Sequence, residues 1–285
     1  MTTIVNDSYK GQEPISNDEI KAMLLSQPQE TTSTSDFPTE IIDLPSKGYF
    51  YPEGHPLSSG KIELKYMTAK EEDILSSSNL IRQGVVLDKL LQSLVVTKVK
   101  FDDILLMDKN AIFIAARVLA YGNDYPVMVE CPSCGTKHNE HIDLSTFDEK
   151  EVDWSGFKPG QTTFDFTLPI SKKTLSLKFL THGDETAIAE DLKQAKKISK
   201  FTGVDPELTT RLKYMIVAID GNTDKKAIEA YSQSMLSRDS LALREYLKKV
   251  TPDIDTTFAF DCSNCDYENL KMAMPITVQF FWPGA

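Results

Sequence analysis

The chain is organised around two short stretches, Cys131-Pro132-Ser133-Cys134-Gly135 and Cys262-Ser263-Asn264-Cys265, which contain all four of its cysteines. A Cys-x-x-Cys pair in a tight turn presents two thiolates on one side of the backbone. Two such pairs together form a tetrahedral four-sulfur site, the usual closed structural zinc site. The pattern therefore predicts one structural zinc ion per chain, bound by Cys131, Cys134, Cys262 and Cys265.

Three other interpretations of the cysteines stay open: metal-free thiol turns, a redox pair, and a local site completed by His138 or His141. The redox interpretation is disfavoured because a thioredoxin-like motif opens a helix, whereas each pair here lies between two predicted strands. The local site is disfavoured because a Cys-Cys-His-His finger places about 12 residues between its pairs, and His138 lies much closer to Cys134.

The charge of the chain argues against nucleic acid as its partner. The 285 residues include 42 acidic and 31 basic side chains, which gives a formal net charge of -11. Affinity for nucleic acid comes mainly from basic charge. The one lysine-rich stretch, residues 193–200, has the pattern of a solvated helix face. We therefore expect protein partners, with no nucleic acid and no small-molecule ligand.

Targeting and membrane signals are also lacking in the sequence. Residues 1–7 have neither the basic start nor the apolar core of a secretory signal. The most apolar run, residues 111–120, is too short to span a bilayer. A soluble, intracellular protein is the expectation, and in a reducing cytosol paired cysteines bind metal more often than they form disulfides.

Residues 1–40 have the polar, acidic composition of a disordered arm. One short helix is predicted within it, near residues 16–26, because Ser16 and Glu19 match a capping box. Such a helix can dock in a partner's groove or fold back on its own domain, and the sequence does not decide between them. The apolar residues that would make the contact are Ile15, Ile20, Met23 and Leu24.

From residue 61 the same order of elements is predicted twice, which indicates a tandem duplication. Each copy consists of a strand, three helices, a strand, a cysteine pair and a strand, and Thr68 and Thr181 occupy matching cap positions. In the first copy these elements are expected at residues 61–68, 69–82, 87–95, 108–120, 127–130 and 139–144. In the second copy they are expected at residues 174–181, 184–199, 212–219, 237–250, 258–261 and 267–272.

The predicted fold class is therefore α+β, with two related lobes joined at the cysteine pairs. The first lobe covers residues 41–146, a connection covers residues 147–173, and the second lobe covers residues 174–285. Two facing copies related by a pseudo-twofold axis would each supply two thiolates to one zinc ion. The zinc ion, bound by both cysteine pairs, would then link the two lobes.

Aromatic residues stand out in two places. The run Tyr49-Phe50-Tyr51 follows a Pro-Ser-Lys-Gly turn, where aromatic side chains are usually structural anchors. Phe281 and Trp282 lie near the end of the sequence, where they could dock on a partner or cover the core. We favour the core for both sites, and partner binding by Phe281 and Trp282 is the alternative.

The sequence predicts that the protein is not an enzyme. It contains no phosphate-binding loop, dinucleotide fingerprint, nucleophile elbow or zinc-protease helix. The acidic run Glu71-Glu72-Asp73 is better explained by the start of a helix, whose dipole favours negative charge. A four-sulfur zinc ion is coordinatively closed and offers no position for activating water.

Two further motifs carry a resemblance to a known family. Leu44-Pro45-Ser46-Lys47-Gly48-Tyr49-Phe50-Tyr51-Pro52, followed by Met67-Thr68-Ala69-Lys70-Glu71-Glu72, resembles the baseplate proteins of T-even-type tailed phages. The likeness covers about residues 42–145. It implies a hub subunit or a hub-assembly chaperone, with other phage baseplate or hub proteins as partners. The implied location is the host cytoplasm during assembly, and the tail baseplate of the virion if the protein stays there.

The rival to this assembly role is a regulatory or nucleic-acid-binding protein with a zinc ribbon. Charge separates the two, because DNA affinity that falls steeply with salt would support the rival.

Overall fold

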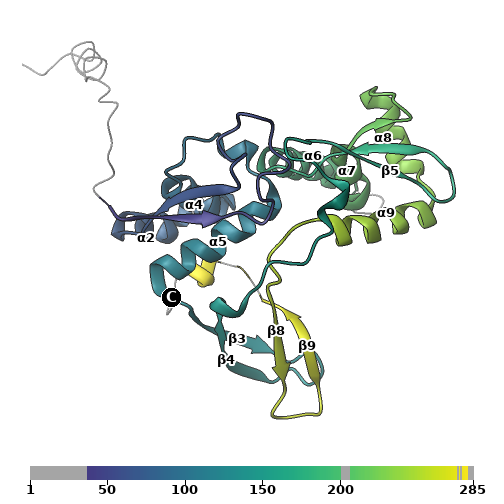
Figure 1. Cartoon of the computed structure of the whole chain (residues 1–285). Coiled ribbons are helices and arrows are strands. Elements are labelled where there is room, and N and C mark those ends of the chain that lie inside the picture. The colour runs from purple at the N-terminus through teal and green to yellow at the C-terminus, as the bar shows by residue number, and fades with distance from the viewer. Residues whose placement is uncertain (1–36, 200–205, 275, 277, 282–285) are drawn as a thin grey trace, which may run out of the picture. The chain divides into compact units, whose positions relative to one another are not determined.

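The structure is a computed structural model that describes residues 37–199, 206–274, 276 and 278–281 (Figure 1). Most of the predicted arm, residues 1–40, lies outside this range, together with its short helix and Ile15, Ile20, Met23 and Leu24. Trp282 also lies outside it. Strand β1 begins at Thr39, inside the segment predicted as an arm, because residues 39–43 pair with a second strand.

The N-terminal half, residues 37–146, starts with a two-stranded antiparallel sheet and continues as helices. Strand β1 (Thr39–Asp43) pairs with β2 (Lys61–Lys65). The turn between the strands buries Phe50 and Tyr51, in agreement with their expected role as structural anchors. The helices that follow are α2 (Ala69–Ser76), α3 (Ser78–Gln83), α4 (Val86–Leu94), the short η1 (Phe101–Asp103) and α5 (Leu106–Tyr121).

The C-terminal half, residues 147–281, contains a three-stranded sheet of order β5-β6-β7. Both pairings are antiparallel, and Leu175 of the central strand lies opposite Phe166 on one side and Ile219 on the other. The elements are β5 (Phe164–Thr167), β6 (Thr174–Leu177), α6 (His182–Ser199), α7 (Glu207–Met215), β7 (Ile216–Ile219), α8 (Lys225–Ser234), α9 (Ser237–Val250) and the short η4 (Val278–Phe281).

The cysteine pairs lie at the tips of two β-hairpins, one from each half. Strand β3 (Asp124–Glu130) pairs with β4 (Lys137–Asp143), and β8 (Thr257–Asp261) pairs with β9 (Glu268–Ala273). Figure 1 shows the two hairpins side by side. They share a small apolar core of their own, formed by Val129, Cys131, Phe260 and Cys262.

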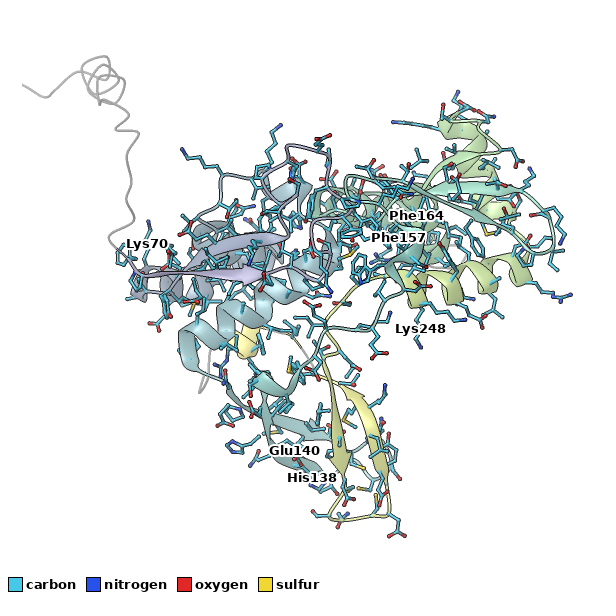
Figure 2. All side chains as sticks on the ribbon, viewed as in Figure 1. Lys70, His138, Glu140, Phe157, Phe164 and Lys248 are labelled. Carbon is cyan, nitrogen blue, oxygen red and sulfur yellow. The ribbon has the colours of Figure 1, made fainter. Side chains whose placement is uncertain are left out.

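A larger apolar core extends through the rest of both halves. The segment predicted as a connection contributes to it. Phe157 and Phe164, labelled in Figure 2, are buried with their ring centroids 5.5 Å apart. Phe164 also lies 4.8 Å from the ring of Phe179. Residues 147–173 therefore do more than link two lobes, because their aromatic side chains fill the interior.

Helix η4 completes the core of the N-terminal half. Phe280 and Phe281 are both 0% exposed. The Phe281 ring lies 5.7 Å from that of Phe113 in α5, and the Phe280 ring lies 4.9 Å from that of Tyr125 in β3. Phe281 is thus buried in the core, the alternative that the sequence favoured, and its side chain offers no surface to a partner.

One set of helix-start contacts occurs in both halves. In the first, Glu71 accepts hydrogen bonds from the Thr68 amide at 3.0 Å and from Lys65 Nζ at 2.8 Å. In the second, Asp184 accepts from the Thr181 amide at 3.0 Å and from Lys178 Nζ at 2.7 Å. The lysine, threonine and carboxylate have the same spacing in both places, so each strand is tied to the helix that follows it.

A second recurring set of contacts involves a buried aspartate in the first turn of α5 and of α9. Asp108 accepts from the Ser46 amide at 3.0 Å, and Asp239 accepts from the Ile170 amide at 2.7 Å. Both donors follow a Leu-Pro pair, at Leu44 and at Leu168. Each turn also includes a lysine with a left-handed backbone, Lys47 with φ 50° and Lys172 with φ 59°.

Several predicted elements differ from the structure. Residues 69–82 form two helices, because Ser77 is extended with ψ 101°. Residues 216–219 form β7 where a helix was predicted, since their apolar side chains complete the sheet beside β6. The third helix was expected from residue 108, but α5 starts at Leu106, and the Asp108 carboxylate accepts a hydrogen bond from the Ser46 amide. Helix α8 and strand β5 were not predicted.

The α+β class is confirmed, since small antiparallel sheets stand beside helices in both halves. Within the described ranges, no helix combines the length and the apolar character needed to cross a membrane.

Candidate metal centre

Tight turns position the sulfur atoms at the hairpin tips. The Cys131 amide donates to the Thr136 carbonyl at 2.9 Å and the Gly135 amide donates to the Cys131 carbonyl at 2.9 Å. Gly135 has a φ of 69°, a left-handed conformation in which a Cβ is strained. In the second hairpin the Cys262 amide donates to the Tyr267 carbonyl at 3.0 Å. Both turns therefore direct two cysteine side chains to one side.

The four sulfur atoms form one compact cluster, with all of them within 4.8 Å of one another. Cys131 Sγ lies 3.8 Å from Cys265 Sγ, and Cys134 Sγ lies 3.7 Å from Cys262 Sγ. A tetrahedral zinc site with Zn–S distances of about 2.3 Å has sulfur atoms about 3.8 Å apart. The two sulfur–sulfur contacts match this spacing, so the cluster is compatible with a four-coordinate ion.

The pairing of the sulfurs is reciprocal between the hairpins. The first cysteine of each pair contacts the second cysteine of the other, as in Cys131 with Cys265 and Cys262 with Cys134. A metal ion at the centre would consequently bind both hairpins equally, and neither hairpin could hold it with four protein ligands alone.

Polar groups surround the sulfurs and act on their charge. The hydrogen bond with the Thr136 side chain is the main cause that lowers the pKa of Cys134 to about 5. The Tyr267 amide favours the Cys265 thiolate, but burial and the neighbouring thiols outweigh it and raise the pKa of Cys265 to about 12. Four crowded thiols cannot all ionise alone, and a divalent cation removes this conflict because metal ligation deprotonates thiols.

His138 and Asn264 contact the sulfurs from outside the cluster. His138 Nε2 lies 3.3 Å from Cys262 Sγ, and the residue projects from β4 toward the second hairpin (Figure 2). Asn264 Nδ2 donates to Thr136 Oγ1 at 2.9 Å and lies 3.7 Å from Cys134 Sγ. Hydrogen bonds to coordinating atoms orient the ligands of metal sites. Sequence reasoning did not assign these roles, because each contact joins the two hairpins.

The surroundings of the cluster weigh against two of the other interpretations, the redox pair and the local site completed by a histidine. Cys131 and Cys134 lie in a turn between two strands, whereas a thioredoxin-like pair opens a helix. His141 is exposed and its Nδ1 lies 3.0 Å from Asp124 Oδ1, so it is engaged away from the sulfurs. The group of possible metal ligands found in the described part of the chain is Cys131, Cys134, Cys262 and Cys265, in agreement with the predicted set.

The burial of the site is uneven. Cys131 and Cys262 are buried, whereas Cys134 is exposed. Val127, Phe258 and Met272 pack around the buried pair. One side of the cluster is therefore embedded in apolar side chains and the other is open to solvent, an arrangement that lets an ion enter from the hairpin tips.

The comparisons with known proteins identify the family. The profile described as T4 bacteriophage base plate protein matches residues 44–282. Neither the curated proteins nor the solved structures gave a match. The matched range contains both Leu-Pro turns, both recurring helix starts and all four cysteines. The chain therefore belongs to the T4 bacteriophage base plate protein family.

Proposed function

We propose that this chain is a non-enzymatic protein of the phage tail baseplate that acts through protein–protein contacts, as a subunit of the central hub or as a chaperone of hub assembly. The observation that carries the proposal is the family match over residues 44–282. The motifs Leu44–Pro52 and Met67–Glu72 support the hub in particular, through their resemblance to hub and hub-assembly proteins. Other baseplate or hub proteins are the proposed partners.

We also propose that the four cysteines bind one zinc ion with a structural role. The sulfur spacing supports a tetrahedral ion, and zinc is the usual metal of closed four-cysteine sites. The apparent binding free energy of such an ion is on the order of 10–16 kcal/mol and adds to folding. The ion would thus fix the two hairpins to each other, and with all four positions occupied by sulfur it would not activate water.

The cluster of two cysteine pairs, one from each half, and the recurring contacts together support a tandem duplication. The Lys-Thr-carboxylate set recurs at Lys65 and Lys178 with unchanged spacing. The buried aspartates, the left-handed lysines and the cysteine turns recur in the same order. Unrelated segments would not be expected to repeat three separate features in one sequence order: the helix start, the Leu-Pro turn bound by a buried aspartate, and the cysteine turn. We infer that the N-terminal and C-terminal halves descend from one unit.

The proposed role can be tested in phage-infected cells. A tagged chain would be purified from the cells at intervals after infection, and its partners would be identified by mass spectrometry beside the proteins of purified virions. We expect other baseplate proteins to co-purify with the tagged chain and not with the tag alone. A hub subunit will also be found in virions, whereas an assembly chaperone will be found only in the cells.

One result of the same purification would contradict the proposed baseplate role. Co-purification of DNA that is lost as salt is raised, with no baseplate protein in the sample, would contradict the proposal and support a nucleic-acid-binding role.

A further inference from the structure

The two halves contact each other through a short backbone pairing between helix starts. The Leu106 amide of α5 donates to the Leu180 carbonyl at 3.0 Å, and the His182 amide of α6 donates to the Ile104 carbonyl at 2.8 Å. Leu105 and Thr181 form an antiparallel bridge between these bonds. The residues that precede α5 thus join those that precede α6.

This contact is closely packed. Ile104 is 0% exposed and Leu105 is 4% exposed. The backbone at Gly183 lies close to Asp102: a Cβ added at Gly183 would be 3.1 Å from Asp102 Cβ. Glycine permits this close approach because it has no side chain. In this contact the N-terminal half presents residues 104–106 at the start of α5, defined here as surface A. The C-terminal half presents residues 180–182 at the start of α6, defined as surface B.

Each half also contains residues that correspond, by their place in the repeated unit, to the surface that the other half uses in this contact. The counterpart of surface A is Met235–Ser237 at the start of α9, and that of surface B is Met67–Ala69 at the start of α2. Leu236 has φ -60° and ψ 137°, close to the -65° and 142° of Leu105. The backbone at the start of α9 is therefore already in the conformation that receives a partner at the start of α5.

These counterparts are more exposed than the pair that is in contact: Ala69 and Ser237 are exposed, whereas Met67 and Met235 are half-buried. Leu236 is 51% exposed, against 4% for Leu105. Among the described residues, no backbone hydrogen bond joins residues 235–237 to residues 67–69. The contact between the halves is thus of the head-to-tail kind, which leaves one copy of each surface free unless the repeats close into a ring.

We propose that two copies of this chain associate head to tail, with Met235–Ser237 of one copy paired to Met67–Ala69 of the next. The pairing would repeat the contact already present between the halves, and it rests on the duplication proposed above. The Ala69 amide would donate to the Met235 carbonyl, and the Ser237 amide would donate to the Met67 carbonyl.

The side chains at the free surfaces suit such a contact. Leu236 and Ile170 are exposed apolar residues, 51% and 41%, and Ile170 is held at the start of α9 by its bond to Asp239. Tyr66 would meet Leu236, as Phe179 and Leu105 line a common cavity in the contact between the halves. Lys70 takes the position of Gly183, so the facing residue of the next copy must move back by a few tenths of an ångström to admit the Lys70 Cβ. The Lys70 ammonium would then lie at the C-terminal end of α8, where a cation is favoured.

The test uses proline at the first position of a helix, where it is tolerated because that amide has no partner within the helix. Ala69→Pro removes the proposed donor of one free surface, and Ser237→Pro removes that of the other. The preceding residues are extended, with ψ 173° at Thr68 and 137° at Leu236, as proline requires. Lys225→Pro, at the first position of α8, is the matched control away from both surfaces.

Sedimentation of the purified full chain over a range of concentrations measures the association. We expect the wild-type chain and Lys225→Pro to associate as concentration rises, and each of the other two variants to raise the dissociation constant by about tenfold or more. An equal mixture of Ala69→Pro and Ser237→Pro should give dimers and nothing larger, because each variant keeps the surface that the other lacks.

A wild-type chain that stays monomeric would overturn the proposal, and so would variants that associate like the wild type. These outcomes leave the baseplate role standing, because that role is judged by co-purifying baseplate proteins and not by self-association.

Discussion

Cys131 and Cys265 hold their sulfur atoms 3.8 Å apart although 134 positions separate them in the sequence. The reciprocal pair, Cys134 and Cys262, is 3.7 Å apart. This crosswise arrangement has local twofold character, in contrast to the head-to-tail contact between the starts of α5 and α6. Two halves of one chain thus meet in two different ways, and the cysteine cluster is the symmetric one.

Metal analysis of the purified chain should find close to one zinc ion per chain. Cys262→Ser should release that ion even though Cys131 and Cys134 are intact, because a tetrahedral site that loses one thiolate binds zinc much more weakly. His141→Ala is the matched control and should retain the ion, since His141 pairs with Asp124. Two ions per chain, or full occupancy in Cys262→Ser, would show that the hairpins bind metal separately.

Glu71 should contribute more to stability than its counterpart Asp184. The Glu71 side chain is 0% exposed beside Lys65, whereas Asp184 is 15% exposed beside a Lys178 that is 34% exposed. Glu71→Gln should lower the free energy of unfolding by about 2–4 kcal/mol. Asp184→Asn should lower it by about 1 kcal/mol. Chemical denaturation measures both, and the exposed Asp73→Asn should change little.

The same carboxylate makes stability depend on acid. Burial alone would raise the pKa of Glu71, but hydrogen bonds from Lys65 and Thr68 outweigh it and hold the pKa at about 2, below the ordinary 4.5. Its contribution is therefore present above pH 4.5 and is lost as the pH falls toward 2. Glu71→Gln should lose less stability than the wild type over this interval, and equal losses would contradict the assignment.

His182 should make the contact between the halves sensitive to mild acid. Burial and the nearby Lys109 lower the pKa of His182, against the opposing charges of Asp88, Asp102 and Glu185. The neutral ring accepts from Lys109 Nζ at 3.0 Å, and protonation would place two cations together. This contribution is present above the ordinary histidine pKa of about 6.5 and is lost as the pH falls through the lower folded value.

Denaturation at a series of pH values tests this assignment. His182→Asn keeps an acceptor for Lys109 without a group that titrates, so its stability should fall less than that of the wild type below about pH 6.5. Parallel curves for the two proteins would exclude His182 as the source of the acid sensitivity.

Phe281 should behave as a core residue. Its ring is 0% exposed and lies against Phe113. Phe281→Ala should lower the free energy of unfolding by about 3–5 kcal/mol, the usual loss for a buried aromatic ring. Leu270→Ala, at a site 80% exposed, is the control and should change it by less than about 0.5 kcal/mol. An unchanged melting temperature for Phe281→Ala would return Phe281 to the candidates for partner binding.

The two cysteine turns and much of the helical structure could be predicted from local sequence. Each Cys-x-x-Cys pair, and the apolar periodicity around Leu90 that predicted α4, lies within a few residues. The prediction that the two pairs meet came from the repeated order of elements. Ile216–Ile219 was misassigned because a short apolar run has no period that separates a buried strand from a helix. The residues 216–219 became a strand only because β6 lies beside them.

Contacts between distant segments explain the other errors. Asp108 has the chemistry of a helix cap, but Ser46, which is 62 positions away, donates to its carboxylate. His138 was considered as a ligand within its own hairpin, whereas it contacts Cys262 of the other hairpin at 3.3 Å. Composition and spacing report on neighbours in sequence, and neither specifies which segments meet in the fold.

The position of Phe280 and Phe281 in the interior of the N-terminal half also has a consequence for biosynthesis. Ribosomes deliver residues 37–146 before the rings of Phe280 and Phe281, which lie against Tyr125 and Phe113 in the folded chain. The first hairpin likewise emerges with two of the four clustered cysteines. Folding of the N-terminal half therefore cannot be completed during its own translation. Prematurely terminated chains would keep apolar side chains exposed and only one of the two cysteine pairs.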